Sequence, residues 1–441
     1  MTQQRTLEMQ TFTQYRRLKE INLLGNLTIE HYELPNGLQV AIVVDNTTPI
    51  FSYQTWFKTG SADEPAGHQG LAHLFEHMMF RKTSRREMGE FDRIVNSNGG
   101  TGLNAYTSRD QTVYFFTFPN SKIDLATDLE SDRMTNLMID SSMFETEKGA
   151  VLTERNRGLD DPNRFLWEEV YKLAYTKHNY KYSTIGEAET IKNFTVEEAQ
   201  DFYRTFYTPN NALIIVVGDV QPEAVMASIA DRYGAMEPSE PKKRNVVSEP
   251  VQSEDRIAAI THPKAQTAMI AKVWHIPKME HPDYPALAMV GRLLTSGKSA
   301  LLNERLLNKA KVTSVAADAY NSKDEGTFEF FAQLASGESF DDVENIFNAS
   351  VKELAEGAIS DEQILIAKNN LQREIYRAAT TPAALARLLG DSFINANDLS
   401  FQIRALDRID KVTKDDVRRV VAQYILDAKA TTVYLRPENK N

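Results

Sequence analysis

An internal repeat is the feature that most constrains the fold, because similar segments occur in the same order in both halves of the chain. A strand-like run at residues 50–60 matches 267–277, and a helix-like run at 141–155 matches 360–374. Further pairs are 185–194 with 403–412, the predicted helix starts at Thr195 and Thr413, and the strand-like runs 211–218 and 430–435. A duplication explains this shared order, and chance similarity among common helix patterns is the alternative.

The repeat and the chain length predict two domains. Each half combines strands with helices of 3.6-residue periodicity, which is typical of α+β domains. A chain of 441 residues also exceeds the usual size of one hydrophobic core. Residues 236–250 are rich in Pro, Glu, Lys and Ser and are typical of a linker. We therefore expect an N-terminal domain at 1–235, a linker at 236–250 and a C-terminal domain at 251–441.

Composition excludes several classes of function. The formal net charge of −11 argues against binding of nucleic acid, which needs a basic surface. No apolar run approaches the roughly 18 residues that cross a bilayer, so no membrane span is expected. The first ten residues lack the layout of a secretory signal, which favours the cytoplasm over the periplasm for a soluble protein.

A short motif predicts a metal centre. Residues 73–77 read His-Leu-Phe-Glu-His, so His73, Glu76 and His77 share one face of a predicted helix. The apolar neighbours Leu74 and Phe75 indicate that this helix is largely buried, and buried polar groups need partners. A lone buried histidine is usually an ordinary core residue. The three residues together instead favour a divalent metal, with Glu76 as general base for peptide hydrolysis by metal-activated water.

A catalytic zinc needs a third protein ligand, and the chain has no cysteine to supply it. The other histidines of the first half, His31, His68 and His178, show no comparable pattern. Glu147 and Glu154 are seven residues apart, which places them two turns apart on one helix face. Spacing alone does not choose between them, and solvated carboxylates on a surface helix are the alternative.

The segments around these residues resemble the M16 (pitrilysin/insulinase) metallopeptidases, in which HxxEH replaces HExxH: GHQGLAHLFEHMMF, NAYTSRDQTVYFF and EKGAVLTERN. The resemblance covers nearly the whole chain and includes NGLQVAIVVD at 36–45 and GSADEP at 60–65. It implies a clamshell of two homologous α+β domains, each a mainly antiparallel sheet covered by helices.

The resemblance also implies roles for the site residues. One zinc ion per chain would be bound by His73, His77 and Glu154. Glu76 would be the base that takes a proton from water and passes it to the leaving amine. Glu147 matches a supporting acidic residue, which would hold and tune the site from behind the ligands.

Asn104, Ala105, Tyr106 and Thr107 precede a strand-like run at 112–117. One interpretation is that this segment is an edge strand with a purely structural role. The resemblance instead implies that these four residues bind substrate, because the M16 segment extends its sheet with the backbone of the peptide. That mode of binding implies unfolded peptides and modest selectivity for side chains.

One part of the resemblance fails in the second half. Active relatives carry an arginine and a tyrosine seven residues apart, which help to bind substrate and stabilise the oxyanion. Those positions are occupied here by Leu306 and Thr313, and Arg305 and Tyr320 are out of register.

The intact zinc half and the degraded second half predict a heterodimer. In this reading the chain is a zinc endopeptidase subunit, and an M16 partner subunit supplies the Arg/Tyr pair. A homodimer stays possible. The alternatives are a non-catalytic assembly subunit, like the M16-related core proteins of respiratory complexes, and a peptide-binding partner with vestigial activity.

Overall fold

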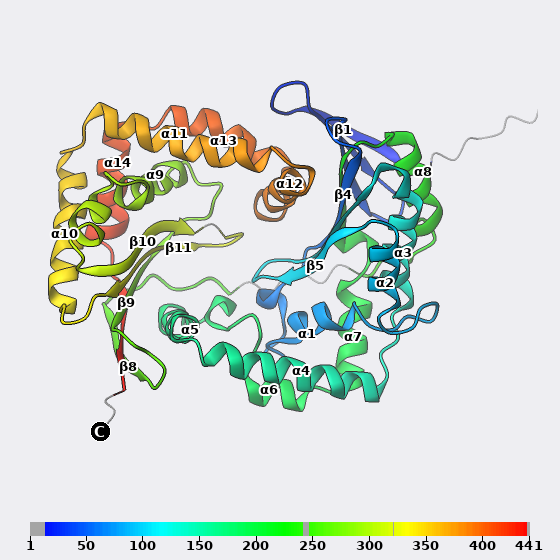
Figure 1. Ribbon diagram of the computed structural model, residues 1–441, viewed down its shortest axis with the longest axis horizontal. Coiled ribbons are helices and arrows are strands. Elements are labelled where there is room, and N and C mark those ends of the chain that lie inside the picture. The colour runs from blue at the N-terminus through cyan, green and yellow to red at the C-terminus, as the bar shows by residue number, and fades with distance from the viewer. Residues whose placement is uncertain (1–13, 241–246, 321, 439–441) are drawn as a thin grey trace, which may run out of the picture.

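The computed structural model describes residues 14–240, 247–320 and 322–438, which form two sheets covered by helices (Figure 1). The first sheet has seven strands: β1 (Arg16–Asn22), β2 (Thr28–Glu33), β3 (Gln39–Val44), β4 (Ile50–Phe57), β5 (Thr101–Thr107), β6 (Thr112–Pro119) and β7 (Ala212–Gly218). The second sheet has five: β8 (Arg256–His262), β9 (Met269–Ile276), β10 (Val312–Tyr320), β11 (Gly326–Leu334) and β12 (Thr431–Pro437).

The two sheets repeat one topology. The order β3-β7-β4-β6-β5 in the first sheet corresponds to β8-β12-β9-β11-β10 in the second. The pairs β3/β7 and β8/β12 are parallel, and the other pairs in both sheets are antiparallel. The antiparallel hairpin of β1 and β2 extends only the first sheet. This shared order confirms the predicted duplication and the mainly antiparallel sheets.

The helices repeat in part, since five consecutive α-helices precede β7 in the first half and five precede β12 in the second. Those of the first half are α1 (Leu71–Met78), α2 (Glu90–Ser97), α3 (Ile123–Asn136), α4 (Ser141–Leu159), α5 (Pro162–Ala174), α6 (Ala188–Asn193), α7 (Val196–Phe206) and α8 (Pro222–Tyr233). Those of the second half are α9 (Tyr284–Thr295), α10 (Phe340–Glu356), α11 (Asp361–Ala378), α12 (Pro382–Ala396), α13 (Phe401–Asp410) and α14 (Lys414–Val421). Thr195 and Thr413 begin α7 and α14 with capping boxes, as the sequence predicts.

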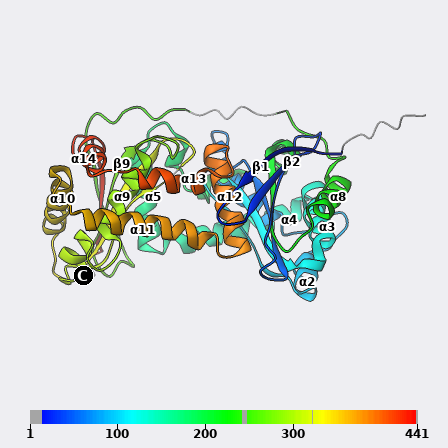
Figure 2. The same ribbon diagram turned by 90° about the horizontal axis from the view of Figure 1, so that it is seen from above.

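Each half contributes one helix to the sheet of the other half. Leu166 and Val170 of α5 share an apolar cluster with Ala271 and Val433 of the second sheet. Conversely, α12 covers the first sheet, where Leu389 joins the cluster that contains Trp56 and Leu213. In Figure 2, α12 accordingly lies at the junction of the two halves. α5 and α12 occupy equivalent places in the repeat, because each is the third of the five helices that precede β7 or β12. The exchange is therefore reciprocal.

The positions of the two sheets in the sequence bear on the predicted domain boundaries. The last strand of the first sheet ends at Gly218, and the first strand of the second sheet begins at Arg256. The predicted linker therefore lies between the two sheets in the sequence. Residues 241–246 of that linker lie outside the described residues. The boundaries at 235 and 250 stay a prediction.

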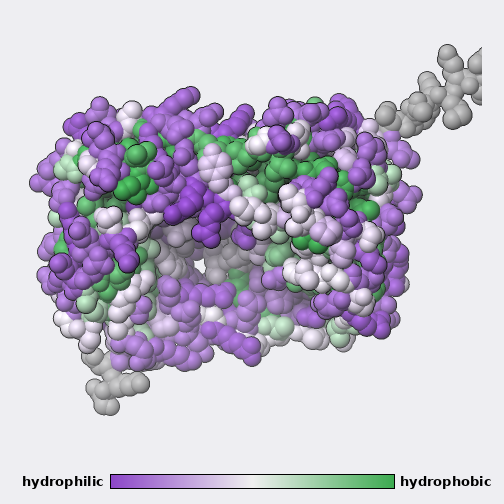
Figure 3. Space-filling view, turned by 45° about the horizontal axis from the view of Figure 1, so that its top comes forward, coloured by the Kyte–Doolittle hydropathy of each residue, from purple (hydrophilic) through white to green (hydrophobic). Residues whose placement is uncertain are grey.

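The two halves face each other across an opening with a largely hydrophilic rim (Figure 3), which agrees with the expected clamshell. None of the helices in the described ranges is both long enough and apolar enough to cross a membrane.

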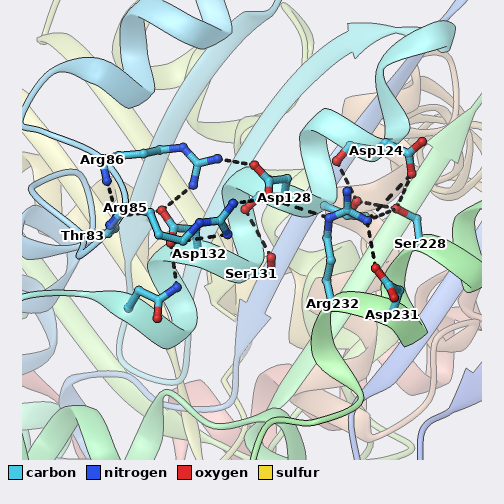
Figure 4. Close-up of polar contacts among 12 residues, drawn as sticks. Thr83, Arg85, Arg86, Asp124, Asp128, Ser131, Asp132, Ser228, Asp231 and Arg232 are labelled. Atoms are coloured by element: carbon cyan, nitrogen blue, oxygen red, sulfur yellow. Dashed lines mark hydrogen bonds and ion pairs between the residues drawn. The ribbon is translucent and has the colours of Figure 1, made fainter.

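A group of ion pairs fixes the segment that follows α1. The guanidinium groups of Arg85 and Arg86 lie against the carboxylates of Asp128 and Asp132 on α3 (Figure 4). The hydroxyl of Thr83 donates to Asp132 at 2.7 Å. Asp132 is buried, so this anchoring is costly to break. Residues 83–86 therefore tie the chain that leaves α1 to α3.

Candidate metal centre

The start of α1 is fixed by a carboxylate and by two glycines. The buried Glu64 accepts hydrogen bonds from the backbone N–H groups of Gly70, at 2.9 Å, and Ala72, at 2.7 Å, which otherwise lack helical partners. Gly70 has φ +102°, and a Cβ there would lie 2.5 Å from the carbonyl oxygen of Ile185. A Cβ on Gly186, which has φ +81°, would lie 2.1 Å from the carbonyl oxygen of Gln69. The backbone therefore meets closely where α1 begins.

His73 and His77 on α1 point their Nε2 atoms at the same oxygen of α4. Glu154 Oε2 lies 3.7 Å from His73 Nε2 and 3.3 Å from His77 Nε2. Among the residues that the structure describes, these three form the one group whose ligand atoms lie close enough together to hold a metal ion, all within 4.8 Å of one another. The Nδ1 atom of His73 is buried without a hydrogen-bond partner. Two imidazole nitrogens and one carboxylate oxygen are a donor set that suits catalytic zinc.

Glu147 meets the same histidine from the other side. Its Oε2 atom lies 3.8 Å from His77 Nδ1, the ring nitrogen that faces away from Glu154. Arg81 donates to Glu147 through Nη2, at 3.0 Å, and its Nε atom lies 2.8 Å from the other oxygen. Glu147 is almost completely buried, whereas 41% of the Glu154 side chain is exposed. The two glutamates of one helix face therefore have different surroundings.

The surroundings shift the pKa values of these groups in different directions. Burial, with the neighbouring His77, lowers the pKa of His73 to about 3, so its imidazole is neutral near pH 7. Burial opposes ionisation of Glu147, but its contacts with His77 and Arg81 lower its pKa overall. The Glu147 carboxylate in turn raises the pKa of His77. A charged Glu147 beside Nδ1 favours a proton on that nitrogen and leaves Nε2 free to bind a metal.

Glu76 lies beside the three candidate ligands but bonds elsewhere. Its Oε2 atom accepts a hydrogen bond of 2.7 Å from the hydroxyl of Thr107 on β5. Burial raises its pKa, which makes the carboxylate a stronger base. In the described structure, α1 and α4 thus bring together all five residues predicted for the metal centre and its base: His73, Glu76, His77, Glu147 and Glu154.

The predicted substrate segment is the outer strand of the first sheet. β5 pairs with β6 on one side and is the last strand in the order, with an irregularity between Thr101 and Asn104. Asn104 is exposed and Ala105 is buried. The ring of Tyr106 packs edge-on to Trp56 with the Arg387 guanidinium 4.7 Å away, so it faces α12. The edge position agrees with either reading of the segment, and its role in substrate binding stays a prediction.

The two positions at which the M16 resemblance leads us to expect an Arg/Tyr pair have other roles in the fold. Leu306 is fully buried in the core of the second half, and Thr313 is exposed on β10. Arg305 is held by Glu353 on α10, with contacts of 2.9 and 2.7 Å. Tyr320 is half exposed at the end of β10.

Three residues near the site were not given these roles from the sequence. Arg81 follows His77 by four positions, and this helical spacing is a signal that could have indicated it. Glu64 lies in the GSADEP segment, but nothing in that segment reveals that its carboxylate caps α1. The bond from Thr107 to Glu76 joins residues 31 positions apart in the chain, and no local pattern predicts it.

Comparison with known proteins decides the family. The family description "Insulinase (Peptidase family M16)" matches residues 39–188, and "Peptidase M16 inactive domain" matches residues 193–371. The chain belongs to peptidase family M16. The resemblance inferred from the sequence is thereby confirmed for both halves of this M16 chain.

Relatives of this M16 chain include named zinc proteases. Zinc protease PqqE of Helicobacter pylori is 29% identical over 417 residues, which are 92% of this chain and 93% of that protein. Mitochondrial-processing peptidase subunit beta of Blastocladiella emersonii is 24% identical over 411 residues, or 92% and 88% of the two chains. The crystal structure of a protease from Helicobacter pylori matches with a TM-score of 0.88 and 28% identity, covering 93% of this chain and 99% of that one. The relatives support a peptidase role for this chain.

Proposed function

We propose that this chain is a zinc-dependent endopeptidase that cleaves unfolded peptides, and that it is the HxxEH-bearing subunit of a heterodimer. The observation that carries the proposal is the convergence of His73, His77 and Glu154 on one point, with Glu76 beside them. The names of the relatives, zinc protease and processing peptidase, support the same chemistry.

The donor set fits one zinc ion per chain. His73 Nε2, His77 Nε2 and a Glu154 oxygen would hold the ion, and Glu147 with Arg81 would orient His77 from behind. His73 is neutral near pH 7, so no proton has to leave it before a metal binds. When bound, zinc supplies Lewis acidity that makes water a nucleophile near neutral pH.

The Glu76 carboxylate would then move protons. One oxygen is held by Thr107, which leaves the other free to accept a proton from water and to pass it to the leaving amine. The raised pKa of Glu76 suits a group that must both accept and release a proton.

The substrate would add a strand to β5. An outer strand offers backbone N–H and C=O groups to an extended peptide, and this mode of binding depends little on side chains. Asn104, Ala105, Tyr106 and Thr107 lie on this strand, which in Figure 1 runs close to α1.

The second half is the basis of the partner proposal. A buried Leu306 and a Thr313 hydroxyl cannot supply the charge and the phenol of an Arg/Tyr pair. A partner M16 subunit that carries the pair would complete the site. One relative is itself named as a subunit, which supports an enzyme of more than one chain.

We expect the tagged chain, purified under native conditions from its own organism, to retain a second M16 protein that lacks HxxEH. Separating the two should lower peptide hydrolysis by about 10²- to 10³-fold, the usual cost of losing an oxyanion donor, and mixing them should restore it. The measurement is the cleavage rate of an internally quenched peptide by each fraction, with subunits identified by mass spectrometry. A chain that hydrolyses the peptide equally fast alone, as monomer or homodimer, would contradict the heterodimer.

A further inference from the structure

Thr107 holds the carboxylate that the proposed reaction depends on. Its hydroxyl donates to Glu76 Oε2 at 2.7 Å, and both side chains are partly shielded from water. A hydroxyl that donates to a charged carboxylate forms a strong bond and limits the rotation of the glutamate side chain. Thr107 is therefore placed to act on the base, in addition to lying on the predicted substrate strand.

The turn that follows Thr107 is fixed to residues 60–62, which follow β4, at several points. The carbonyl oxygens of Ser108 and Arg109 accept hydrogen bonds from the backbone of Ser61, at 3.0 Å, and Ala62, at 2.8 Å. A Cβ on Gly60 would lie 2.4 Å from the Ser108 carbonyl oxygen, so the two backbones are in direct contact. The turn has little freedom to shift along β5.

The same turn is also tied to the second sheet. The Arg109 guanidinium lies 3.7 Å from the centre of the Tyr171 ring on α5. The Tyr171 hydroxyl donates to Glu329 on β11, and Thr327 donates to the same oxygen at 2.7 Å. Tyr171, Arg109 and Glu329 thus form a stack that joins the turn, the exchanged helix and the second sheet.

We infer that Thr107 is a positioning residue for Glu76, and that the Arg109–Tyr171–Glu329 stack keeps Thr107 in place. The inference rests on the proposed role of Glu76 as base. It gives the second half a part in the reaction that needs no Arg/Tyr pair: the half supports the turn from which the base is held.

The test compares Thr107→Val, which removes the hydroxyl at nearly constant volume, with Thr107→Ser, which keeps it. Thr48→Val is the matched control, because Thr48 is exposed in the turn between β3 and β4, outside the proposed site and the substrate strand. Each variant is made in the tagged chain and purified under native conditions, so that any partner subunit is retained. The readouts are kcat and KM for an internally quenched peptide, zinc content, and the crystallographic position of the Glu76 carboxylate.

We expect Thr107→Val to lower kcat by about 10- to 100-fold, since a misplaced catalytic group costs up to about 10²-fold. KM and zinc content should stay close to wild type, and Thr107→Ser should recover most of kcat. In the crystal structure of Thr107→Val, Glu76 should rotate away from residue 107. Arg109→Gln should lower kcat in the same direction and by less, with KM unchanged.

Three results of the activity and zinc measurements would overturn the inference: wild-type kcat in Thr107→Val, failure of Thr107→Ser to recover activity, or loss of zinc together with activity. An unmoved Glu76 in the Thr107→Val crystal structure would do the same, and this readout does not depend on turnover. Glu76→Gln, assayed in parallel, separates the two levels. If that variant keeps full activity, the proposed base is wrong. If it is inactive while Thr107→Val is fully active, only the positioning role is wrong.

Discussion

Glu76→Gln should lower kcat for peptide hydrolysis by about 10²- to 10⁴-fold, the usual contribution of a general base. The amide has nearly the shape of the carboxylate and can still accept the hydrogen bond from Thr107, but it cannot take a proton from water. Zinc content should stay unchanged, because Glu76 is not among the three converging ligands. The measurement is kcat with an internally quenched peptide, combined with metal analysis of the same sample.

Glu87→Gln is the matched control for this experiment. Glu87 is an acidic residue of the same half with 77% of its side chain exposed, and its replacement should change neither kcat nor zinc content. Full hydrolysis by Glu76→Gln would remove Glu76 from the role of base. Loss of zinc in that variant would instead make Glu76 a ligand.

Gly390→Ala should destabilise the protein by about 2–3 kcal/mol, at the upper end of the usual cost of overpacking. A Cβ at this position of α12 would lie 2.1 Å from Cε2 of Trp56, a fully buried side chain of the first sheet. The indole cannot give way, because it packs between the sheet and the exchanged helix. The measurement is the free energy of unfolding from urea denaturation.

Gly149→Ala gives the opposite expectation in the same experiment. Gly149 is a helical glycine of α4 with nothing within 4 Å of its added Cβ, so alanine should stabilise the helix by up to about 1 kcal/mol. If Gly390→Ala were as stable as Gly149→Ala, the close contact of α12 with Trp56 would not exist in solution.

The sequence predicts the features of the fold that depend on short segments. Thr195 and Thr413 begin helices because each caps the backbone three residues ahead, and this signal is entirely local. The repeat predicts two similar sheets because the same segments recur in the same order. The exchange of α5 and α12 is not predictable in this way. An apolar helix face such as that of Leu385 and Leu389 fits either sheet, and only the assembled molecule decides.

In the candidate site, too, local spacing predicts some features and tertiary contacts decide the others. His73 and His77 are four residues apart on one helix, so the pattern indicates that they bind the same metal ion. Glu147 and Glu154 occupy one face of α4, and their spacing does not distinguish them. The distinction comes from tertiary contacts, since Glu154 faces both Nε2 atoms and Glu147 faces Nδ1 of His77. Thr107 reaches Glu76 from another element, and the sequence indicates only its place on a substrate strand.

Metal analysis of the purified chain tests the central claim most directly. The account predicts one zinc ion per chain in the wild type and none in His77→Ala, since two remaining ligands cannot hold the ion tightly. His281→Ala is the control, because His281 lies in the second half with 41% of its side chain exposed and should leave zinc unchanged. A wild-type chain that binds no zinc when it is supplied, or a His77→Ala variant that keeps a full equivalent, would contradict the account.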